Sequence, residues 1–188
     1  KNVIDHYTYV FAGDGCLMEG VSQEAITLAG RQELSKLIVF WDNNNITIDG
    51  KVDLADATNQ VDRFKSSGWH VLEIDGHDPN QIDQAIIEAK KSNKPTMIAC
   101  KTHIALGSSA QDTSKGHGAL TDKTLIEDTK KVYGWSQDAF FVPIEVKAAW
   151  ETLGQKGHEE KLSWENRFSS LSQKKQSEFL RIYSMEVP

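Results

Sequence analysis

The sequence contains little cysteine, little proline and no long apolar run. Its two cysteines, Cys16 and Cys100, are too few for a disulfide framework. We therefore expect reduced thiols and a cytoplasmic location, with Cys16 as a small buried side chain. No stretch approaches the roughly 20 apolar residues of a membrane-spanning helix. Disulfide scaffolds and membrane proteins are thus excluded as classes.

The sequence also lacks an excess of positive charge. Its formal net charge is −6 over 188 residues, so no overall field draws it to nucleic acid or to an anionic membrane. We expect neither as a partner. The length suits one domain with a sizeable core, or one domain with an appended helical segment.

Short apolar runs alternate with amphipathic stretches along the first half of the chain. This pattern predicts a doubly wound, mostly parallel α/β sheet flanked by helices, followed by a helical C-terminal segment. We divide the chain into residues 1–120, which carry the sheet, and residues 121–188, the helical extension. The expected strands are 7–12, 37–41, 67–74 and 96–100, and the expected helices are 23–30, 79–92, 122–133, 143–153 and 158–183.

Polar residues follow these expected strands, where parallel α/β sheets gather their ligands. Gly13, Asp14 and Gly15 follow the first strand, and residues 42–45 (Asp-Asn-Asn-Asn) follow the second. A dinucleotide fingerprint is a poor explanation because the third glycine, Gly20, comes two positions late. A Walker A loop is absent because no Gly-Lys-Ser/Thr follows.

A metal site explains these residues better. Magnesium prefers oxygen ligands and is usually held by one or two protein groups together with substrate phosphates. Asp14 offers a carboxylate, one asparagine of the 43–45 run offers an amide oxygen, and a backbone carbonyl such as that of Ile46 can complete the set. Glycine at positions 13 and 15 lets phosphates approach the backbone, where the Gly15 N–H can donate.

The spacing of these residues resembles a known motif. Gly13-Asp14-Gly15, followed after 27 residues by Asn43-Asn44, resembles the GDG…NN motif of thiamine diphosphate enzymes. The blocks DHYTYVFAGDGCLMEGVSQEA, KLIVFWDNNNITIDG and GWHVLEIDGHD are similar to transketolase segments in the same order. The resemblance covers essentially the whole chain and identifies it as part of the diphosphate-binding domain of a transketolase.

The resemblance implies a ligand set for the metal, Mg²⁺ or Ca²⁺. Asp14 and Asn44 match the side-chain ligands, and Ile46 matches the residue whose carbonyl binds the ion. Asn43 and Asn45 compete for the amide role by position alone, and the family register favours Asn44. Gly13 and Gly15 match the glycines beside the diphosphate of thiamine diphosphate.

The resemblance also implies roles away from the metal. Ile48 and Ile104 match apolar residues that flank the cofactor rings. His117 matches a histidine that contacts the diphosphate and the substrate, although its loop reads GHGALTD where the family commonly reads HGAPLG. Glu19 matches an acidic residue that links the cofactor-activating glutamates of the two active sites in a homodimer.

The implied reaction belongs to the pentose phosphate pathway and moves a two-carbon ketol unit from a ketose phosphate to an aldose phosphate. In the family the cofactor lies between two subunits, and its activating glutamate belongs to a second domain. We therefore expect this chain to be an incomplete piece, inactive without the remaining transketolase segments and a second subunit. The alternatives are another thiamine diphosphate enzyme (a deoxyxylulose-phosphate synthase or a 2-oxo acid dehydrogenase first component) and a non-catalytic cofactor-binding fragment.

Overall fold

Four strands form a single parallel sheet in the computed structural model, which describes residues 3–185. The strand order is β1-β2-β4-β3, and every neighbouring pair is parallel. The strands are β1 (Thr8–Gly13), β2 (Leu37–Asn43), β3 (His70–Asp75) and β4 (Thr96–Lys101). The predicted parallel α/β sheet is confirmed.

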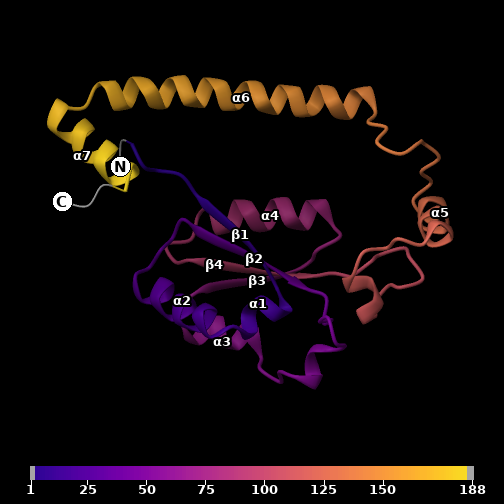
Figure 1. The fold of residues 1–188 in the computed structure, drawn as a ribbon. Helices are drawn as coiled ribbons and strands as arrows, with labels where there is room; N and C mark the ends of the chain where they lie inside the picture. Colours follow the sequence, from indigo (N-terminus) through magenta and orange to yellow (C-terminus); the bar gives the residue numbers. More distant parts are fainter. Residues whose placement is uncertain (1–2, 186–188) are drawn as a thin grey trace. The chain divides into compact units, whose positions relative to one another are not determined.

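Helices cover both faces of this sheet (Figure 1), as a doubly wound fold requires. One face packs against α1 (Asp14–Met18), α2 (Gly20–Arg31) and α3 (Gln60–Ser66). The opposite face packs against α4 (Pro79–Ala89), which begins at Pro79 behind the capping residue Asp78. The helices of the first face connect β1 to β2 and β2 to β3, and α4 connects β3 to β4.

The two central strands are buried on both faces, which explains their continuous apolar runs. On the face of α1–α3, the rings of Phe64 and Trp69 meet edge to face with centroids 4.9 Å apart. On the α4 face, Ile98 packs with Ala89, and both are fully buried. The edge strand β1 is covered less well, and Phe11 keeps 81% of its surface exposed.

Because all four strands are parallel, their carboxyl ends lie at one edge of the sheet. In the β1–β2 ladder Gly13 is the partner of Asp42, and in the β2–β4 ladder Asp42 is the partner of Cys100. Lys101 in turn pairs with Asp75 at the end of β3. The loops that leave these ends carry most of the residues singled out in the sequence.

Most predicted element boundaries differ from the observed ones by a few residues. The strand predicted over 67–74 begins at His70 because Gly68 has φ of +88°, a left-handed conformation that ends the preceding helix. The helix predicted over 23–30 begins earlier, at Gly20. The helix predicted over 122–133 is observed as α5 (Lys123–Val132), capped by the Asp122 side chain.

The chain forms two compact units. Residues Tyr7–Ser136 carry the sheet and α5, and the described residues before Tyr7 join those from Gln137 onward in the other unit. The second unit contains α6 (Ile144–Ser169) and α7 (Gln173–Tyr183). None of the helices in residues 3–185 has both the length and the apolar character of a membrane span.

The helices of the second unit correct two predictions. The expected break between 153 and 158 is wrong, because α6 continues through Gly154 and Gly157. The expected continuous helix over 158–183 is also wrong, because the chain turns after Ser169. Packing explains the turn: the ring of Phe179 in α7 lies 5.4 Å from that of Phe168 in α6, which requires the chain to fold back.

Candidate functional site

Asp14 is the central polar residue at the carboxyl edge of the sheet. It is the first residue of α1, directly after β1, and only 7% of its surface is exposed. One carboxylate oxygen accepts a hydrogen bond from Trp41 Nε1 at 2.9 Å, and the other accepts one from the backbone N–H of Asn45 at 2.8 Å. Asp14 therefore joins the end of β1 to the loop that follows β2.

The surroundings of Asp14 are short of positive charge. Burial is the main cause that raises the pKa of this carboxyl above its ordinary value, while the hydrogen bonds from Trp41 and Asn45 oppose the rise. The nearby Asp42 carboxylate raises the pKa further, and the Lys101 ammonium lowers it least. A divalent cation beside Asp14 would offset the cost of burying this charge.

Asn44 lies in the same loop, and its side chain has a defined orientation. Its Oδ1 accepts from the backbone N–H of Ile46 at 3.0 Å, and its Nδ2 donates to Asp42 at 3.2 Å. Asn45 has φ of +64°, a conformation that asparagine tolerates, and offers its backbone N–H to Asp14. Asn43 gives its carbonyl oxygen to the Thr102 N–H.

These oxygen donors suit a hard cation. Each carboxylate oxygen of Asp14 and the amide oxygen of Asn44 accepts one hydrogen bond of 2.8–3.0 Å and keeps a lone pair for a ligand. Within residues 3–185, no group of three or more His, Cys, Asp or Glu side chains could hold a metal ion. Mg²⁺ is commonly held by one or two protein oxygens together with the oxygens of a bound phosphate, and a carboxylate with amide and carbonyl oxygens is a donor set of that kind.

Gly13 and Gly15 leave open space above the backbone. A Cβ built at either position meets no atom within 4 Å, and Gly13 has φ of −87°, which any residue can adopt. By contrast, a Cβ at Gly30 would lie 1.8 Å from the carbonyl oxygen of Ser67. The packing of the chain explains Gly30 but does not explain Gly13 or Gly15, whose open backbone leaves room for a ligand.

The remaining predicted residues lie on other segments. Glu19 is exposed between α1 and α2, and His117 is exposed at the end of a 3-10 turn (Ser114–His117). Ile48 is 69% exposed, and Ile104 is half-buried in the loop after β4. In the described part of the chain no recorded hydrogen bond links Glu19 or His117 to Asp14, so their roles stay predictions.

Two residues near this site, Trp41 and Thr102, were not singled out as site residues from the sequence. Trp41 orients the Asp14 carboxylate, and Thr102 donates its hydroxyl to Asp42. The sequence did contain a signal for Trp41. It is a tryptophan near the end of an expected buried strand, and a buried indole N–H needs a hydrogen-bond acceptor close by. The expectation that Cys16 is buried is wrong: in the short helix α1 it is exposed, while Leu17 faces the core.

A groove of about 850 Å³ lies on the α4 side of the sheet, next to the edge strand. Most of its lining is apolar, and Gly13, Asp42 and Thr102 bring polar groups to it. The apolar lining residues are Tyr9, Phe11, Ala12, Phe40, Ile82, Ile86 and Cys100. A large open apolar surface of this kind is typical of a site that another protein segment covers.

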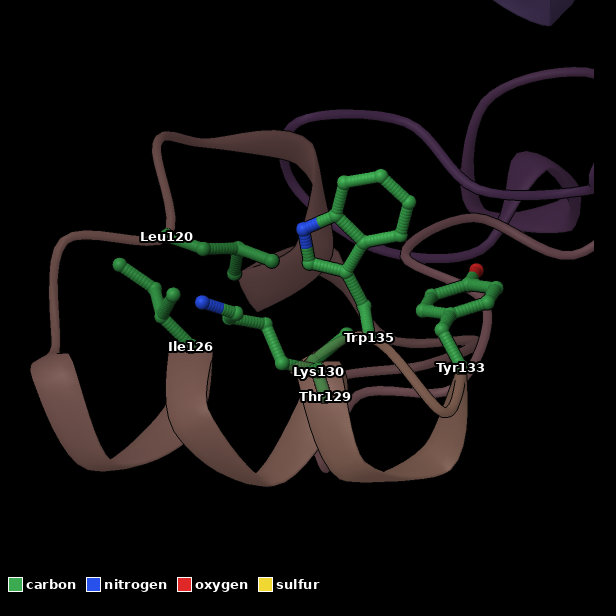
Figure 2. Close-up of a pocket in the computed structure, with 6 residues that line it drawn as sticks. All are labelled: Leu120, Ile126, Thr129, Lys130, Tyr133 and Trp135. Atoms are coloured by element: carbon green, nitrogen blue, oxygen red, sulfur yellow. The ribbon is translucent and has the colours of Figure 1, made fainter. Parts of the chain in front are cut away.

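A second cavity, of about 500 Å³, lies on α5 and the residues that flank it (Figure 2). The indole of Trp135, the ring of Tyr133 and the chain of Lys130 border it in this view, together with Leu120, Ile126 and Thr129. Its described lining includes no carboxylate and no imidazole. Its described lining carries Lys130 and Tyr133 instead, whereas the carboxylate and amide oxygens gather at the carboxyl edge of the sheet.

The fold and the site define the chain as an open α/β domain with oxygen acceptors and two unobstructed glycines at the carboxyl edge of its sheet. The family model for the transketolase thiamine diphosphate binding domain matches residues 1–188. A transketolase from Rhodobacter capsulatus is 51% identical over 182 residues, which are 96% of this chain and 27% of that protein. A transketolase from Aquifex aeolicus is 49% identical over 144 residues, 76% of this chain and 21% of that protein.

Solved structures agree with the sequence matches. Transketolase from Campylobacter jejuni superposes with a TM-score of 0.88 at 37% identity, covering 94% of this chain and 28% of that one. A Pichia stipitis transketolase complex with sedoheptulose-7-phosphate gives a TM-score of 0.87 at 42% identity, covering 94% and 27%. The chain belongs to the transketolase family, in its thiamine diphosphate binding domain, and spans 21–28% of the length of these relatives.

Proposed function

We propose that the chain supplies the diphosphate- and metal-binding part of a transketolase. The whole enzyme transfers a two-carbon ketol unit from a ketose phosphate to an aldose phosphate. The observation that carries this proposal is the buried Asp14 carboxylate, bonded to the loop after β2 and flanked by two unobstructed glycines. Sugar phosphates as substrates fit the complex with sedoheptulose-7-phosphate solved for the Pichia stipitis relative.

Asp14, Asn44 and the carbonyl of Ile46 hold the divalent ion, Mg²⁺ or Ca²⁺, in this proposal. The raised pKa of Asp14 supports it, because burial of a carboxylate without a strong cationic neighbour favours a site that receives a cation. The open backbone at Gly13 and Gly15 admits the diphosphate oxygens. The chemistry that thiamine diphosphate supplies when bound is stabilisation of the carbanion formed on the transferred unit.

Ile48 and Ile104 are the proposed apolar contacts of the cofactor rings. His117 is the proposed contact of the diphosphate and the substrate. Glu19 is the proposed link between the activating glutamates of two subunits. Its exposure between α1 and α2 leaves it available for such a contact.

The proposed partners are the remaining transketolase segments and a second subunit that completes a homodimer. The groove on the α4 face supports the first of these, because Phe11 is 81% exposed and the surface around it is apolar. Within the chain we assign residues 1–120 to the later part of the diphosphate-binding domain and residues 121–188 to its helical extension. We place the enzyme in the cytoplasm and the pentose phosphate pathway.

Calorimetry with thiamine diphosphate and Mg²⁺ tests the proposal. We expect the chain assembled with the remaining segments to bind the cofactor only when Mg²⁺ or Ca²⁺ is present, and Asp14→Ala to abolish this metal-dependent binding. Asp53→Ala, at an exposed acid in the loop after β2, is the matched control. Unchanged cofactor affinity in Asp14→Ala contradicts the metal site, and turnover by the isolated 188 residues contradicts the need for other segments.

A further inference from the structure

Two histidines and an aspartate connect the turn after β3 to the loop after β4. The backbone N–H of His103 donates to Nε2 of His77 at 3.0 Å, and the two rings stack with centroids 5.8 Å apart. Nδ1 of His103 lies 2.9 Å from both carboxylate oxygens of Asp112. We call His77, His103 and Asp112 the histidine cluster.

The hydrogen bonds define which nitrogen carries a proton. His77 Nε2 accepts from a backbone N–H, so it is unprotonated and the ring proton lies on Nδ1. His103 Nδ1 faces two carboxylate oxygens and therefore donates. The same hydrogen bond is the main cause that lowers the pKa of Asp112 below its ordinary value. Each ring thus has one orientation that satisfies its partners.

His77 stands on a rigid part of the fold. Its backbone N–H donates to the Asp75 side chain at 2.9 Å, and the N–H of Gly76 donates to the carbonyl of Lys101 at 2.8 Å. A Cβ at Gly76 would lie 2.5 Å from Thr102 Cγ2, so this turn is packed directly on the end of β4. The acceptor that His77 offers to His103 is consequently fixed relative to the sheet.

The loop held by His103 carries two residues that the proposed function uses. His103 immediately precedes Ile104, whose carbonyl accepts from the Asp112 N–H at 3.2 Å. Ala105 and Asp112 have φ of +50° and +57°, a strained region for residues other than glycine that persists only where neighbours enforce it. The adjoining turn packs on this loop, because a Cβ at Gly116 would lie 2.8 Å from that of Ala105.

We propose that His103, held between His77 and Asp112, is a positioning residue that sets where Ile104 and the turn ending in His117 stand relative to the cofactor. This inference rests on the proposed function. It adds His77, His103 and Asp112, to which the resemblance to transketolases gives no role. In this proposal His103 touches neither cofactor nor substrate. It acts through the loop after β4. The cluster is about half exposed, with side-chain exposures of 46% for His103 and 45% for Asp112. Each contact therefore contributes modestly.

Calorimetric titration of the assembled enzyme with thiamine diphosphate, whose Kd we expect to rise with the KM, and steady-state kinetics test the role. His77→Phe keeps a ring but removes the acceptor, and His103→Phe removes the donor to Asp112. We expect each to raise the KM for thiamine diphosphate about fivefold, the size of effect expected for exposed polar contacts, while kcat at saturating cofactor changes far less. His77→Gln and His103→Asn, which return an acceptor or a donor near the lost nitrogen, restore the wild-type KM.

The control is His70→Phe. His70 pairs with Glu88 at the amino end of β3, the strand that precedes His77, and so lies away from the carboxyl edge of the sheet. If His103→Phe does not fold, Asp112→Asn gives a milder test: it keeps an acceptor, loses the charge and raises the KM in the same direction. An unchanged KM in the Phe variants, or an equal rise in His70→Phe, overturns the role. A wild-type enzyme without affinity for thiamine diphosphate instead refutes the proposed function, and this role with it.

Discussion

The indole N–H of Trp41, near the end of β2, donates to the carboxylate of Asp14 at the start of α1 over 2.9 Å. The two residues are 27 positions apart and meet because β1 and β2 are parallel neighbours with Gly13 opposite Asp42. Together with the Asn45 N–H, this contact leaves the carboxylate a single orientation. A carboxylate fixed before any ligand arrives loses little conformational freedom on binding one.

Trp41→Phe tests this contact. The change removes one hydrogen bond to a buried charged group, so we expect the free energy of unfolding to fall by about 2 kcal/mol. The affinity for thiamine diphosphate with Mg²⁺ falls as well, because Asp14 loses its fixed orientation. Denaturant titration and calorimetry measure the two effects.

Trp69→Phe provides the matched control for this prediction. The Trp69 indole also donates from a buried site, to the carbonyl of Ile26 at 2.8 Å, but lies in the core under α2 and α3. Its loss lowers stability by a comparable amount and leaves cofactor affinity intact. Equal losses of affinity in both variants contradict a specific role for Trp41.

Gly15→Ala is expected to change stability and cofactor affinity in opposite directions. A Cβ at Gly15 meets no protein atom within 4 Å, and alanine favours a helix, so we expect stability to rise by up to about 1 kcal/mol. Cofactor affinity falls about tenfold or more, equivalent to about 1.4 kcal/mol, because the methyl group occupies the space left for the diphosphate. Thermal unfolding and cofactor titration on the same samples give both values.

Gly30→Ala shows the opposite behaviour. The Cβ of an alanine at this position would lie 1.8 Å from the Ser67 carbonyl oxygen, so we expect the free energy of unfolding to fall by about 3 kcal/mol or more. If Gly15→Ala binds thiamine diphosphate as tightly as the wild type, the proposal that the diphosphate lies against the backbone of Gly15 is contradicted.

The sheet could be predicted from the sequence because its central strands are continuous apolar runs that end at polar turns. Asp14 and the 43–45 run could be placed at one edge for the same reason, since parallel strands bring their carboxyl ends together. The Asp14–Trp41 contact could not be predicted, because it depends on the register of two strands. Periodicity shows which face a residue occupies but not which residue lies opposite.

The errors in the helical segment have a different cause. Gly154 and Gly157 are local signals for a break, each costing about 1 kcal/mol in a helix interior, and α6 nevertheless continues through both. The observed turn depends on tertiary contacts between aromatic rings of α6 and α7, such as Phe168 and Phe179. The pairing of His77 with His103 escaped prediction likewise, because it requires β3 and β4 to be neighbours.

The two cysteines differ in their expected reactivity. Burial, with a smaller contribution from the Asp42 carboxylate, raises the pKa of Cys100 to about 11, whereas Cys16 is exposed. At about pH 8 we expect iodoacetamide to label Cys16 and to leave Cys100 unmodified, because the thiolate is the reactive form. Peptide mass spectrometry reads the result, and labelling in denaturant, which modifies both, is the control. Modification of Cys100 at the rate of Cys16 contradicts its burial in the core.

Asp78 makes the stability of the chain depend on pH through the cap of α4. Its side chain accepts from Gln81 Nε2 and from the backbone N–H of Asn80, and these bonds, the Gln81 side chain first, lower its pKa below the ordinary 3.8. A lowered pKa in the folded state means that the stabilisation is complete above the unfolded value and is lost as pH falls through the folded one. Asp78→Asn keeps a cap acceptor but cannot titrate. We therefore expect the difference in unfolding midpoint between wild type and Asp78→Asn to be constant near neutral pH and to shrink in acid.

Urea titrations across that range measure the difference. The comparison isolates one carboxyl group, since Asp56 and Asp112, whose pKa values are also lowered, are common to both proteins. A difference that does not vary with pH shows that the charge of Asp78 adds nothing to the cap.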